Sequence, residues 1–582
     1  MLSRLPVQLP PLARSFSFKR TWPLGVDVAV FAVLFAVAWG IAGLARYWWG
    51  AVTPAVEISR SPWALPGYAF YSVIRRFSAY LLSLLFAIGY GYAAANRPRL
   101  ERVLIALLDI LQSIPVLSFL PGVMLAMISL VPGHQLGIEL GSVLLIFTGQ
   151  VWNMAFSFYS SLKAIPKELT EASSVYGFSA WQRFVQLELP YGVIGLLWNS
   201  MVSVAGGWFF LMACEMFVLG KRDFRLPGLG SYLQVAASNG DVPAMCWGIG
   251  CMILVIVLID QVLWRPLIDW SDRFKFEQVE SGERGTSFLM PLLKKSRVAA
   301  LPEMILAPVG ERLTRYFAKR HRNAANVTPI PSLAGGLVQF ALGLVAVGAA
   351  GYGAFSAVVV LLGIPGQDWL RTLGVAGVTF LRVNLSLLIA TLWTVPVGVA
   401  IGFNPRLAKI AQPLAQIAAS VPATALFPIL LLALIQVGGG LGIASILLML
   451  LGTQWYILFN VIAGAIAIPS ELREVAKVFG FTRILEWRVV ILPGIFPYLV
   501  TGLITASGGA WNASIVAEYF HLRGKVFTTY GLGAQISAAS DAGRFDLLLL
   551  STVVMAAMVV CINRLVWRPL YRLAETRYRL DG

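Results

Sequence analysis

The sequence contains little charge for its length. Only 13% of its 582 residues are charged, 58% are hydrophobic, and the mean hydropathy is +0.76. About a quarter of the residues of a soluble domain are charged, so this composition excludes a protein surrounded mainly by water. Three histidines and four cysteines are scattered along the chain without metal-ligand spacing. We therefore expect neither a metal site nor a disulfide framework.

Motifs for catalysis are also missing. The sequence has no G-x-x-x-x-G-K-[ST] phosphate loop, since Gly220-Lys221 and Gly524-Lys525 lack both the first glycine and the final Ser or Thr. No Ser-His-Asp triad or catalytic pair of carboxylates is recognisable. We expect that the chain is not an enzyme, binds no cofactor and does not hydrolyse ATP.

Long apolar runs dominate what is present. Each is about long enough to cross a hydrocarbon core of roughly 30 Å as a helix, and an open sheet would leave backbone groups unpaired in lipid. The sequence therefore predicts an all-α integral membrane protein with about twelve transmembrane helices. The predicted spans are 25–46, 70–95, 103–130, 138–163, 191–214, 243–264, 334–363, 377–402, 407–434, 440–467, 494–517 and 546–566.

The net charge of +17 is best explained by topology. If the N-terminus is cytoplasmic and the spans alternate, most lysines and arginines fall in the cytoplasmic segments, as the positive-inside rule requires. We expect a multi-pass protein with both termini in the cytoplasm, contact with membrane lipid and no binding of nucleic acid.

The chain repeats itself, which is the strongest organisational feature of the sequence. A set of nine residues recurs 303 positions later, and Pro115 and Pro121 recur after 307 positions. The set is Trp152, Pro166, Glu171, Gly177, Pro190, Trp208, Glu215, Trp264 and Pro266, recurring as Trp455, Pro469, Glu474, Gly480, Pro493, Trp511, Glu518, Trp567 and Pro569. The pattern predicts two parallel six-helix repeats related by an axis along the membrane normal.

This repeat sets the expected domain boundaries. We predict a first transmembrane domain at 1–270, a cytoplasmic linker at 271–330 and a second transmembrane domain at 331–582. The linker contains a possible amphipathic helix from Pro302 to Arg322. It is open whether that helix lies on anionic headgroups or is a solvated connector.

The loop after the fourth span has the same polar pattern in both halves, from Ile165 to Pro190 and from Ile468 to Pro493. Its first proline suits a first helical turn, the glutamates there favour the positive end of the helix dipole, and its glycine can adopt a positive φ. We expect two short helices hinged at the glycine, with a later proline starting the fifth span. Such an elbow is suited to a groove in another protein.

Here the chain resembles the permeases of importer-type ABC transporters, whose coupling helix carries the pattern E-A-A, three residues, G and, further on, L-P. Both copies depart slightly, at Ser173 and Val475. The resemblance implies that each elbow docks on one of two copies of an ABC ATPase, which bind ATP and Mg and drive alternating access. The implied coupling residues are Glu168, Glu171, Ala172, Gly177 and Pro190 in the first half, and Glu471, Glu474, Ala476, Gly480 and Pro493 in the second.

A finer resemblance is to the nitrate, sulfonate and taurine type of importer. It is based on the S-I-P and S-V-P that end at Pro115 and Pro422, and on a glutamate followed by G-L-G after each fifth span. The resemblance implies a small anionic solute such as nitrate, bicarbonate or a sulfonate, a bacterial inner membrane, and a periplasmic or lipid-anchored substrate-binding protein. Members normally pair two separate chains, so the fusion departs from their pattern.

The fifth spans carry the candidate residues of a translocation pathway: Trp208, Glu215, Trp511, Asn512 and Glu518. A spacing of seven places each tryptophan and glutamate on one helix face. An acid in a membrane is costly unless it is paired or faces water. Two interpretations therefore remain for Glu215 and Glu518: they line the pathway, or they hydrogen-bond the start of the following segment.

Basic residues in the two loops after the fifth spans break the charge rule. They are Lys221, Arg222, Arg225, Arg523, Lys525 and Arg544. These loops either draw in an anion or dock an acidic patch of a binding protein. Arg76 and Arg382, near the outer ends of the second spans, have the same two interpretations.

An ion-coupled secondary transporter with two parallel repeats is the alternative function. It would need no glycine-hinged elbow, and it should carry coupling acids within its spans. Asp27, Asp109 and Asp260 lie too close to the predicted span ends for that role. A membrane enzyme is disfavoured by the missing catalytic cluster.

Overall fold

The computed structural model describes residues 57–219, 222–271, 351–522 and 525–578, together with a few isolated positions. The predicted span 25–46, the first part of the span 334–363 and nearly all of the linker lie outside these residues. Lys221 and Arg523 also lie outside them.

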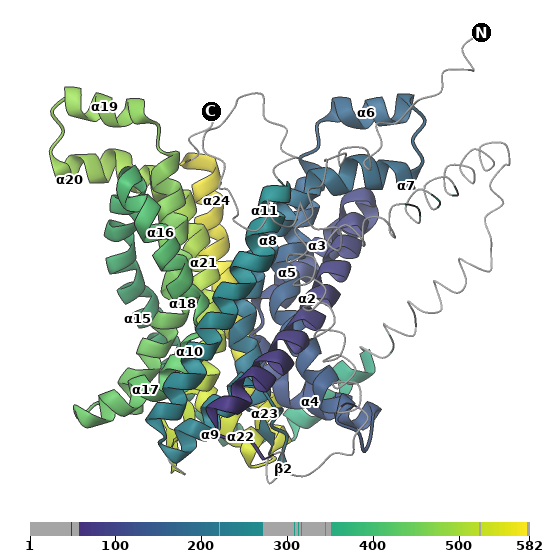
Figure 1. Ribbon diagram of the computed structural model, residues 1–582, viewed down its shortest axis with the longest axis vertical. Coiled ribbons are helices and arrows are strands. Elements are labelled where there is room, and N and C mark those ends of the chain that lie inside the picture. Colours follow the sequence, from purple (N-terminus) through teal and green to yellow (C-terminus); the bar gives the residue numbers. More distant parts are fainter. Residues whose placement is uncertain are drawn as a thin grey trace, which may run out of the picture. The chain divides into compact units, whose positions relative to one another are not determined.

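The described residues are almost entirely helical, as the sequence predicts (Figure 1). Within the described ranges, eight helices are long and apolar enough to span a membrane, or nine if one bent pair counts as a single span. The helices of the first half are η1 (Pro62–Ala64), α2 (Leu65–Asn96), α3 (Pro98–Ser113), η2 (Val116–Phe119), α4 (Leu120–Leu130), α5 (Leu136–Lys163), α6 (Lys167–Val175), α7 (Ala180–Arg183), η3 (Phe184–Glu188), α8 (Leu189–Glu215), α9 (Leu229–Asn239), α10 (Val242–Ile259), η4 (Asp260–Trp264) and α11 (Arg265–Ser271).

The second half repeats this order. After a short apolar helix at Gly351–Leu362 come α15 (Gly366–Phe403), α16 (Pro405–Ser420), α17 (Ala423–Gln436), α18 (Leu441–Ala467), α19 (Ser470–Val478), α20 (Arg483–Glu486), η7 (Trp487–Ile491), α21 (Leu492–Ala517), α22 (Leu532–Asp541), α23 (Phe545–Ile562), η8 (Asn563–Trp567) and α24 (Arg568–Arg577). The elements η3, η4, η7 and η8 are π-helical turns at equivalent places in the two halves.

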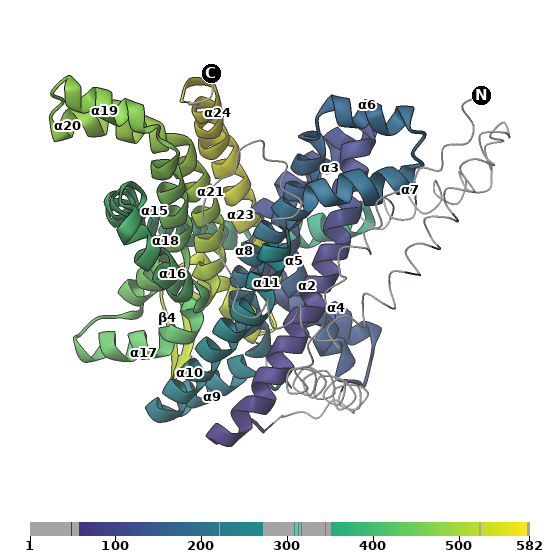
Figure 2. The ribbon, with the colours of Figure 1, turned by 45° about the horizontal axis from the view of Figure 1, so that its top comes forward.

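The third predicted span of each half, 103–130 and 407–434, is not one continuous helix. Ile114 (φ −84°, ψ 130°) separates α3 from η2 and α4, and Val421 (φ −75°, ψ 118°) separates α16 from α17. In the second half the two helices are bent by 83° (Figure 2). A proline follows each of these residues, and the residue before a proline is forced out of the α region.

Glycines bring the long helices of the second half close together. Gly398 and Gly402 of α15 face Val461 and Ala465 of α18, and Gly464 of α18 faces Tyr498 of α21. Small residues of this kind allow close backbone approach between helices in a membrane, where apolar burial drives association weakly.

Two short antiparallel hairpins follow the fifth spanning helices, where the sequence predicts only loops. The first pairs β1 (Val218–Leu219) with β2 (Arg222–Asp223), and the second pairs β3 (Tyr519–Leu522) with β4 (Lys525–Thr528). Strands of two to four residues are too short to give a periodic signal.

In the second hairpin the Tyr519 hydroxyl donates to Asp541 Oδ2 at 2.7 Å, and burial raises the pKa of Tyr519.

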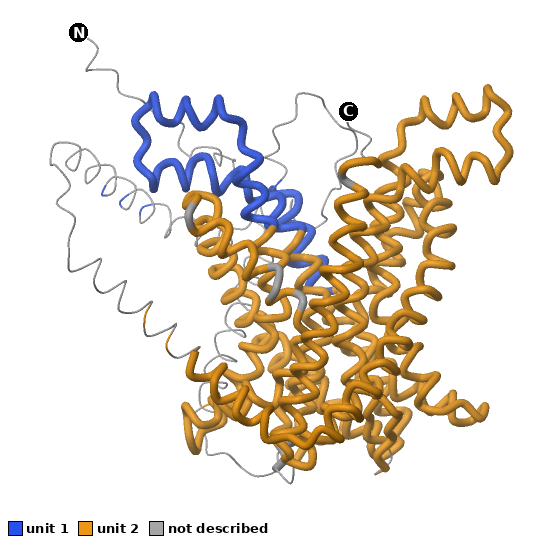
Figure 3. Tube along the Cα trace, turned by 180° about the vertical axis from the view of Figure 1, so that it is seen from behind, with its two compact units in different colours: residues 1–47, 157–198, 258–340 blue, residues 48–156, 199–257, 341–582 orange. Residues whose placement is uncertain are grey.

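The chain divides into two compact units (Figure 3). The described part of the first unit comprises residues 157–198 and 258–271, which include α6, α7 and α11. The second unit contains residues 57–156, 199–257 and the described residues from 351 onward. This division follows contacts rather than the repeat, so the domain boundaries drawn from the repeat stay a prediction.

Alanine substitution of two glycines on α15 tests the tight helix packing. A Cβ at residue 402 would lie 2.6 Å from Ala465 Cβ and 3.0 Å from the Ile462 carbonyl oxygen, whereas one at residue 377 would meet nothing within 4 Å. We expect Gly402→Ala to cost about 1–3 kcal/mol through overpacking and Gly377→Ala to be neutral or stabilising by up to about 1 kcal/mol. Thermal unfolding in detergent measures both. Equal unfolding temperatures would contradict the packing described.

Candidate functional site

The first elbow consists of α6, a glycine corner and α7. Gly177 has a φ of +65°, a region that side chains disfavour. Its N–H donates to the Ser174 carbonyl, and the next N–H, of Phe178, donates to the Ser173 carbonyl, both at 3.0 Å. These two bonds form a Schellman C-cap. Ser179 then begins α7 with a capping box closed by Gln182.

The second elbow is built in the same way. Gly480 has a φ of +64° and donates to the Lys477 carbonyl at 3.0 Å, and Phe481 donates to the Ala476 carbonyl at 2.9 Å. The Thr482 hydroxyl accepts from the N–H of Leu485 to begin α20. The positive φ that the sequence predicts for the glycine is therefore present in both elbows.

Each elbow exposes two large apolar side chains at equivalent positions. Val175 and Tyr176 are 85% and 74% exposed, and Val478 and Phe479 are 84% and 74% exposed. Exposed apolar pairs on a projecting segment are typical of a surface that binds another protein. The glutamates Glu168, Glu171, Glu471 and Glu474 are also exposed.

The departures from the E-A-A pattern are explained by burial. The third position of the pattern, Ser173 or Ala476, is buried, so it requires a small residue. The second position holds Ala172 in one elbow and Val475 in the other, and Val475 is 48% exposed. A larger apolar side chain therefore fits there without disturbing the helix.

Pro190 and Pro493 are the second residues of α8 and α21, close to where the sequence predicts the fifth spans to begin, but no break separates these helices from the elbows. Residues Ala180–Glu215 and Arg483–Ala517 each form one long helical element, and a π-helical turn precedes each proline. A proline has no N–H and its ring crowds the preceding turn. The wider π-helical turn accommodates the proline while the helix continues.

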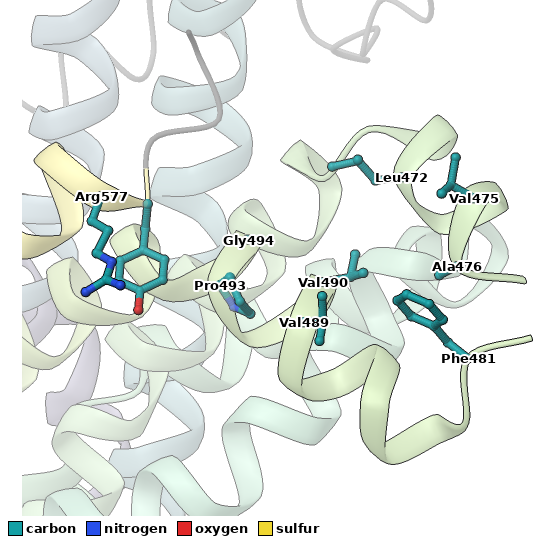
Figure 4. Close-up of a pocket in the computed structure, with 10 residues that line it drawn as sticks. Leu472, Val475, Ala476, Phe481, Val489, Val490, Pro493, Gly494 and Arg577 are labelled. Atoms are coloured by element: carbon teal, nitrogen blue, oxygen red, sulfur yellow. The ribbon is translucent and has the colours of Figure 1, made fainter. Parts of the chain in front are cut away.

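A hollow of about 360 Å³ lies beneath the second elbow (Figure 4). Apolar side chains from α19, from the segment after the glycine corner and from the start of α21 line it, and the end of α24 contributes Arg577 and Tyr578. Arg473 on α19 places its guanidinium 3.8 Å from the centre of the Phe403 ring at the end of α15. The second elbow is thus packed against three spanning elements of its own half.

At the other end of α21, Glu518 is fully buried. Its Oε1 accepts from Arg382 Nη1 and from the Thr379 hydroxyl, each at 2.9 Å. Its Oε2 accepts from the backbone N–H of Gly533 at 2.8 Å, in the first turn of α22. The carboxylate therefore joins α15, α21 and the start of α22.

Glu215 occupies the equivalent place in the first half. Its Oε1 accepts from Ser72 at 2.7 Å and from Arg75, and its Oε2 accepts from the Gly230 N–H at 2.7 Å. Here Arg75 also holds a second carboxylate, Glu139, through two bonds of 2.7 Å. The buried group thus contains one cation and two anions.

The G-L-G that follows each of these glutamates is explained by this contact. A Cβ at residue 228 would lie 2.3 Å from the Glu215 carboxyl carbon, and one at residue 531 would lie 2.2 Å from Glu518 Oε2. A side chain at either position would displace the carboxylate. Of the two interpretations given for Glu215 and Glu518, lining the pathway or bonding the segment that follows, these contacts are those of the second.

The other candidate pathway residues differ in exposure. The rings of Trp208 and Trp511 are 2% and 1% exposed. Asn512 is partly exposed, and its Oδ1 accepts from the N–H of Leu117 at 3.3 Å. That bond joins α21 of the second half to η2 of the first, directly after the break at Pro115.

Among the basic residues predicted near the mouth, only some are described. Lys525 is exposed on β4, Arg222 lies in β2, and Arg225 is partly exposed. Arg544 pairs with Asp546 at 3.0 Å. Arg382 pairs with Glu518 at 2.9 Å, a contact that neither of its two predicted roles at the mouth includes.

The sequence analysis missed Arg75 and Glu139. Arg75 lies beside Arg76, and only the contact with Glu215 identifies it as the counterpart of Arg382. The offset of 307 positions between Pro115 and Pro422 also separates Arg75 from Arg382, so a comparison of α2 with α15 at that offset would have identified Arg75.

Comparison with known proteins follows the same repeat. The profile of the family described as "Binding-protein-dependent transport system inner membrane component" matches residues 84–263 and 394–579. Each matched region contains one elbow and one of the buried glutamates.

Individual relatives match a shorter part of the chain. The taurine transport system permease protein of Escherichia coli (strain K12) is 29% identical over 183 residues, which cover 31% of this chain and 62% of the relative. The nitrate import permease protein of Leptolyngbya laminosa is 29% identical over 185 residues, and the bicarbonate transport system permease protein of Synechococcus elongatus is 30% identical over 185 residues. Each of these two alignments covers 32% of this chain and 63% of the relative.

A double-mutant cycle tests the buried pair of the second half. Glu518→Gln leaves Arg382 without its carboxylate and Arg382→Met leaves the carboxylate without its cation, so we expect each to cost about 3–5 kcal/mol. The double variant should cost less than the sum by about 1–3 kcal/mol. Denaturant unfolding of the purified chain measures these values, and strict additivity would show that the two side chains do not interact.

Proposed function

The chain belongs to the family of binding-protein-dependent transport system inner membrane components, and from this premise we propose that it is the permease of an ATP-binding-cassette importer. It is a multi-pass membrane protein in which the family's domain occurs twice. Both transmembrane domains would thus be supplied by one polypeptide. The observation that carries the proposal is the pair of elbows with matching Schellman glycines and matching exposed apolar pairs.

Each elbow would dock on one copy of a separate ABC ATPase, which binds ATP and Mg. The apolar pair Val478 and Phe479 would enter a groove of that subunit, and the exposed glutamates of α19 would meet polar groups at its rim. Closure of the two ATPase subunits would move the elbows and so drive alternating access. The packing of Arg473 on Phe403 supports transmission of this movement from α19 to α15.

The proposed orientation rests on the distribution of charge. The elbows and both termini would be cytoplasmic in a bacterial inner membrane, as the positive-inside rule indicates. The hairpins at the other ends of α8 and α21 would then face the periplasm, where Lys525 and its neighbours would dock an acidic patch of a periplasmic or lipid-anchored substrate-binding protein.

The solute would be a small anion. Three relatives carry the names of taurine, nitrate and bicarbonate transport in their own descriptions. Of the five candidate pathway residues, the partly exposed Asn512 has the position best suited to contact a passing solute, since it lies where the two halves meet. The contacts of Glu215 and Glu518 support a framework role.

Co-purification and energy dependence test the proposal directly. The tagged chain, extracted gently from its native membrane, should bring an ATPase with it, and solute uptake into vesicles should stop when ATP is depleted. Uptake that continues without ATP, together with purification of the chain without an ATPase, would overturn the proposal in favour of an ion-coupled transporter.

Substitution of both corner glycines tests the coupling role of the elbows. Valine at φ near +65° is strained by about 1–2 kcal/mol at each site, enough for about a tenfold change in an equilibrium. We expect Gly177→Val/Gly480→Val to reduce ATP-dependent uptake about tenfold or more while the spanning helices stay folded. Asparagine tolerates the left-handed region, so Gly177→Asn/Gly480→Asn is the matched control and should retain most uptake. Normal uptake in the valine variant would refute the role.

A further inference from the structure

Arg76 is a buried cation that has no hydrogen-bond acceptor in the part of the chain that the structure describes. It lies on α2 and is 3% exposed, and its guanidinium carbon lies 4.1 Å from the centre of the Trp208 ring. Within the described residues none of its three side-chain nitrogens has a hydrogen-bond partner. A charge inside a membrane protein is costly without a partner, and such residues are commonly functional.

The nearby carboxylates do not serve Arg76. Both oxygens of Glu139 accept from Arg75, and the oxygens of Glu215 accept from Arg75, Ser72 and the backbone of Gly230. Two arginines and two glutamates balance in formal charge, but both glutamates face the same arginine. The donors of the Arg76 guanidinium therefore remain available to a further anion.

Gln150 provides a second, independent observation. It lies on α5 and is fully buried, and neither its amide oxygen nor its amide nitrogen has a partner among the described residues. Its amide lies against Gly207, where a Cβ would be 2.0 Å from Nε2, and Gly207 directly precedes Trp208. Consecutive residues of α8 thus contact two unpartnered polar side chains from two other helices.

The second half has no such group at the equivalent positions. Ser72 and Arg75 make the same contacts as Thr379 and Arg382, so Arg76 corresponds to Val383. The counterpart of Gln150 is Thr453, whose hydroxyl donates to the Met449 carbonyl at 2.7 Å. The second half therefore has an apolar side chain and a hydroxyl bonded within its own helix at the two positions where the first half has unpartnered donors.

We propose that Arg76 and Gln150 form a transient binding site for a small oxyanion, so that the charged contact of the transported solute comes from the first half alone. This inference rests on the proposed function. A guanidinium presents a planar fork of donors that matches two oxygens of one oxyanion, and the glutamine amide adds two further donors. Because Arg76 is buried in this conformation, the site opens to the pathway at another stage of the transport cycle.

The test compares two variants that place the same residue at equivalent positions. Arg76→Met and its control Val383→Met are assembled with the ATPase and the binding protein and reconstituted into vesicles, with taurine, nitrate and bicarbonate as probes. We expect the Arg76→Met chain to stay associated with its ATPase subunits. Its unfolding temperature should equal or exceed that of the unchanged chain, because the substitution removes an unpaired buried charge. Its uptake of the transported anion should fall at least about tenfold, whereas Val383→Met should transport normally.

A binding measurement supplements uptake. Millimolar amounts of the transported anion should raise the unfolding temperature of the unchanged complex, and this shift should vanish in Arg76→Met. If Arg76→Met does not fold, Arg76→Lys answers the same question. Lysine keeps the charge but lacks the planar pair of guanidinium donors, so the KM for the anion should rise.

The outcomes separate this inference from the proposed function. Unchanged uptake and an unchanged anion-induced shift in Arg76→Met would overturn the inference alone, as would a normal KM in Arg76→Lys. ATP-dependent uptake of only solutes that carry no oxyanion group would also overturn it and leave the permease function intact. Absence of any ATP-dependent uptake by the unchanged complex would overturn both.

Discussion

A buried carboxylate at the end of each fifth spanning helix organises the membrane domain around it. Glu518 accepts bonds from α15 and from the first turn of α22, and Glu215 does the same with α2 and α9. Buried groups that water does not reach depend on partners within the protein. The position of the spanning helices, the hairpin that leaves them and the glycines that approach the carboxylate are therefore mutually dependent, and a change in one must be accommodated by the rest.

The two halves share the main elements of their framework and differ in their interior. The ion pair between the second and fifth spans, the corner glycine and the π-helical turns occur twice at matching positions. Beside Trp208 the first half has Arg76, and beside the preceding Gly207 it has Gln150; the equivalent positions of the second half hold Val383 and Thr453. Fusion into one chain makes such a difference permanent, since two copies of a single-domain permease would be identical.

The sequence predicted the helical class, the repeat and the corner glycines because each depends on local residue type and spacing. It did not predict the break at Ile114 or Val421, since the apolar runs continue across both, although the following proline was a signal that could have been used. It could not resolve the role of Glu215 and Glu518, because their partners lie about 140 positions away in the chain. The short hairpins and the unpartnered state of Arg76 depend on tertiary contacts that no single-chain pattern records.

The long helix α21 has a mechanical consequence. Its 26 residues correspond to about 39 Å at a rise of about 1.5 Å per residue. One end continues through the π-helical turn into α20, which lies across the direction of α21 (Figure 1). At the other end, Glu518 is bound to Arg382 of α15. A tilt of α21 by a few degrees about its elbow end would therefore move the ion pair by about 3 Å, so that a displacement of the second elbow would reach α15 at the opposite end of the helix.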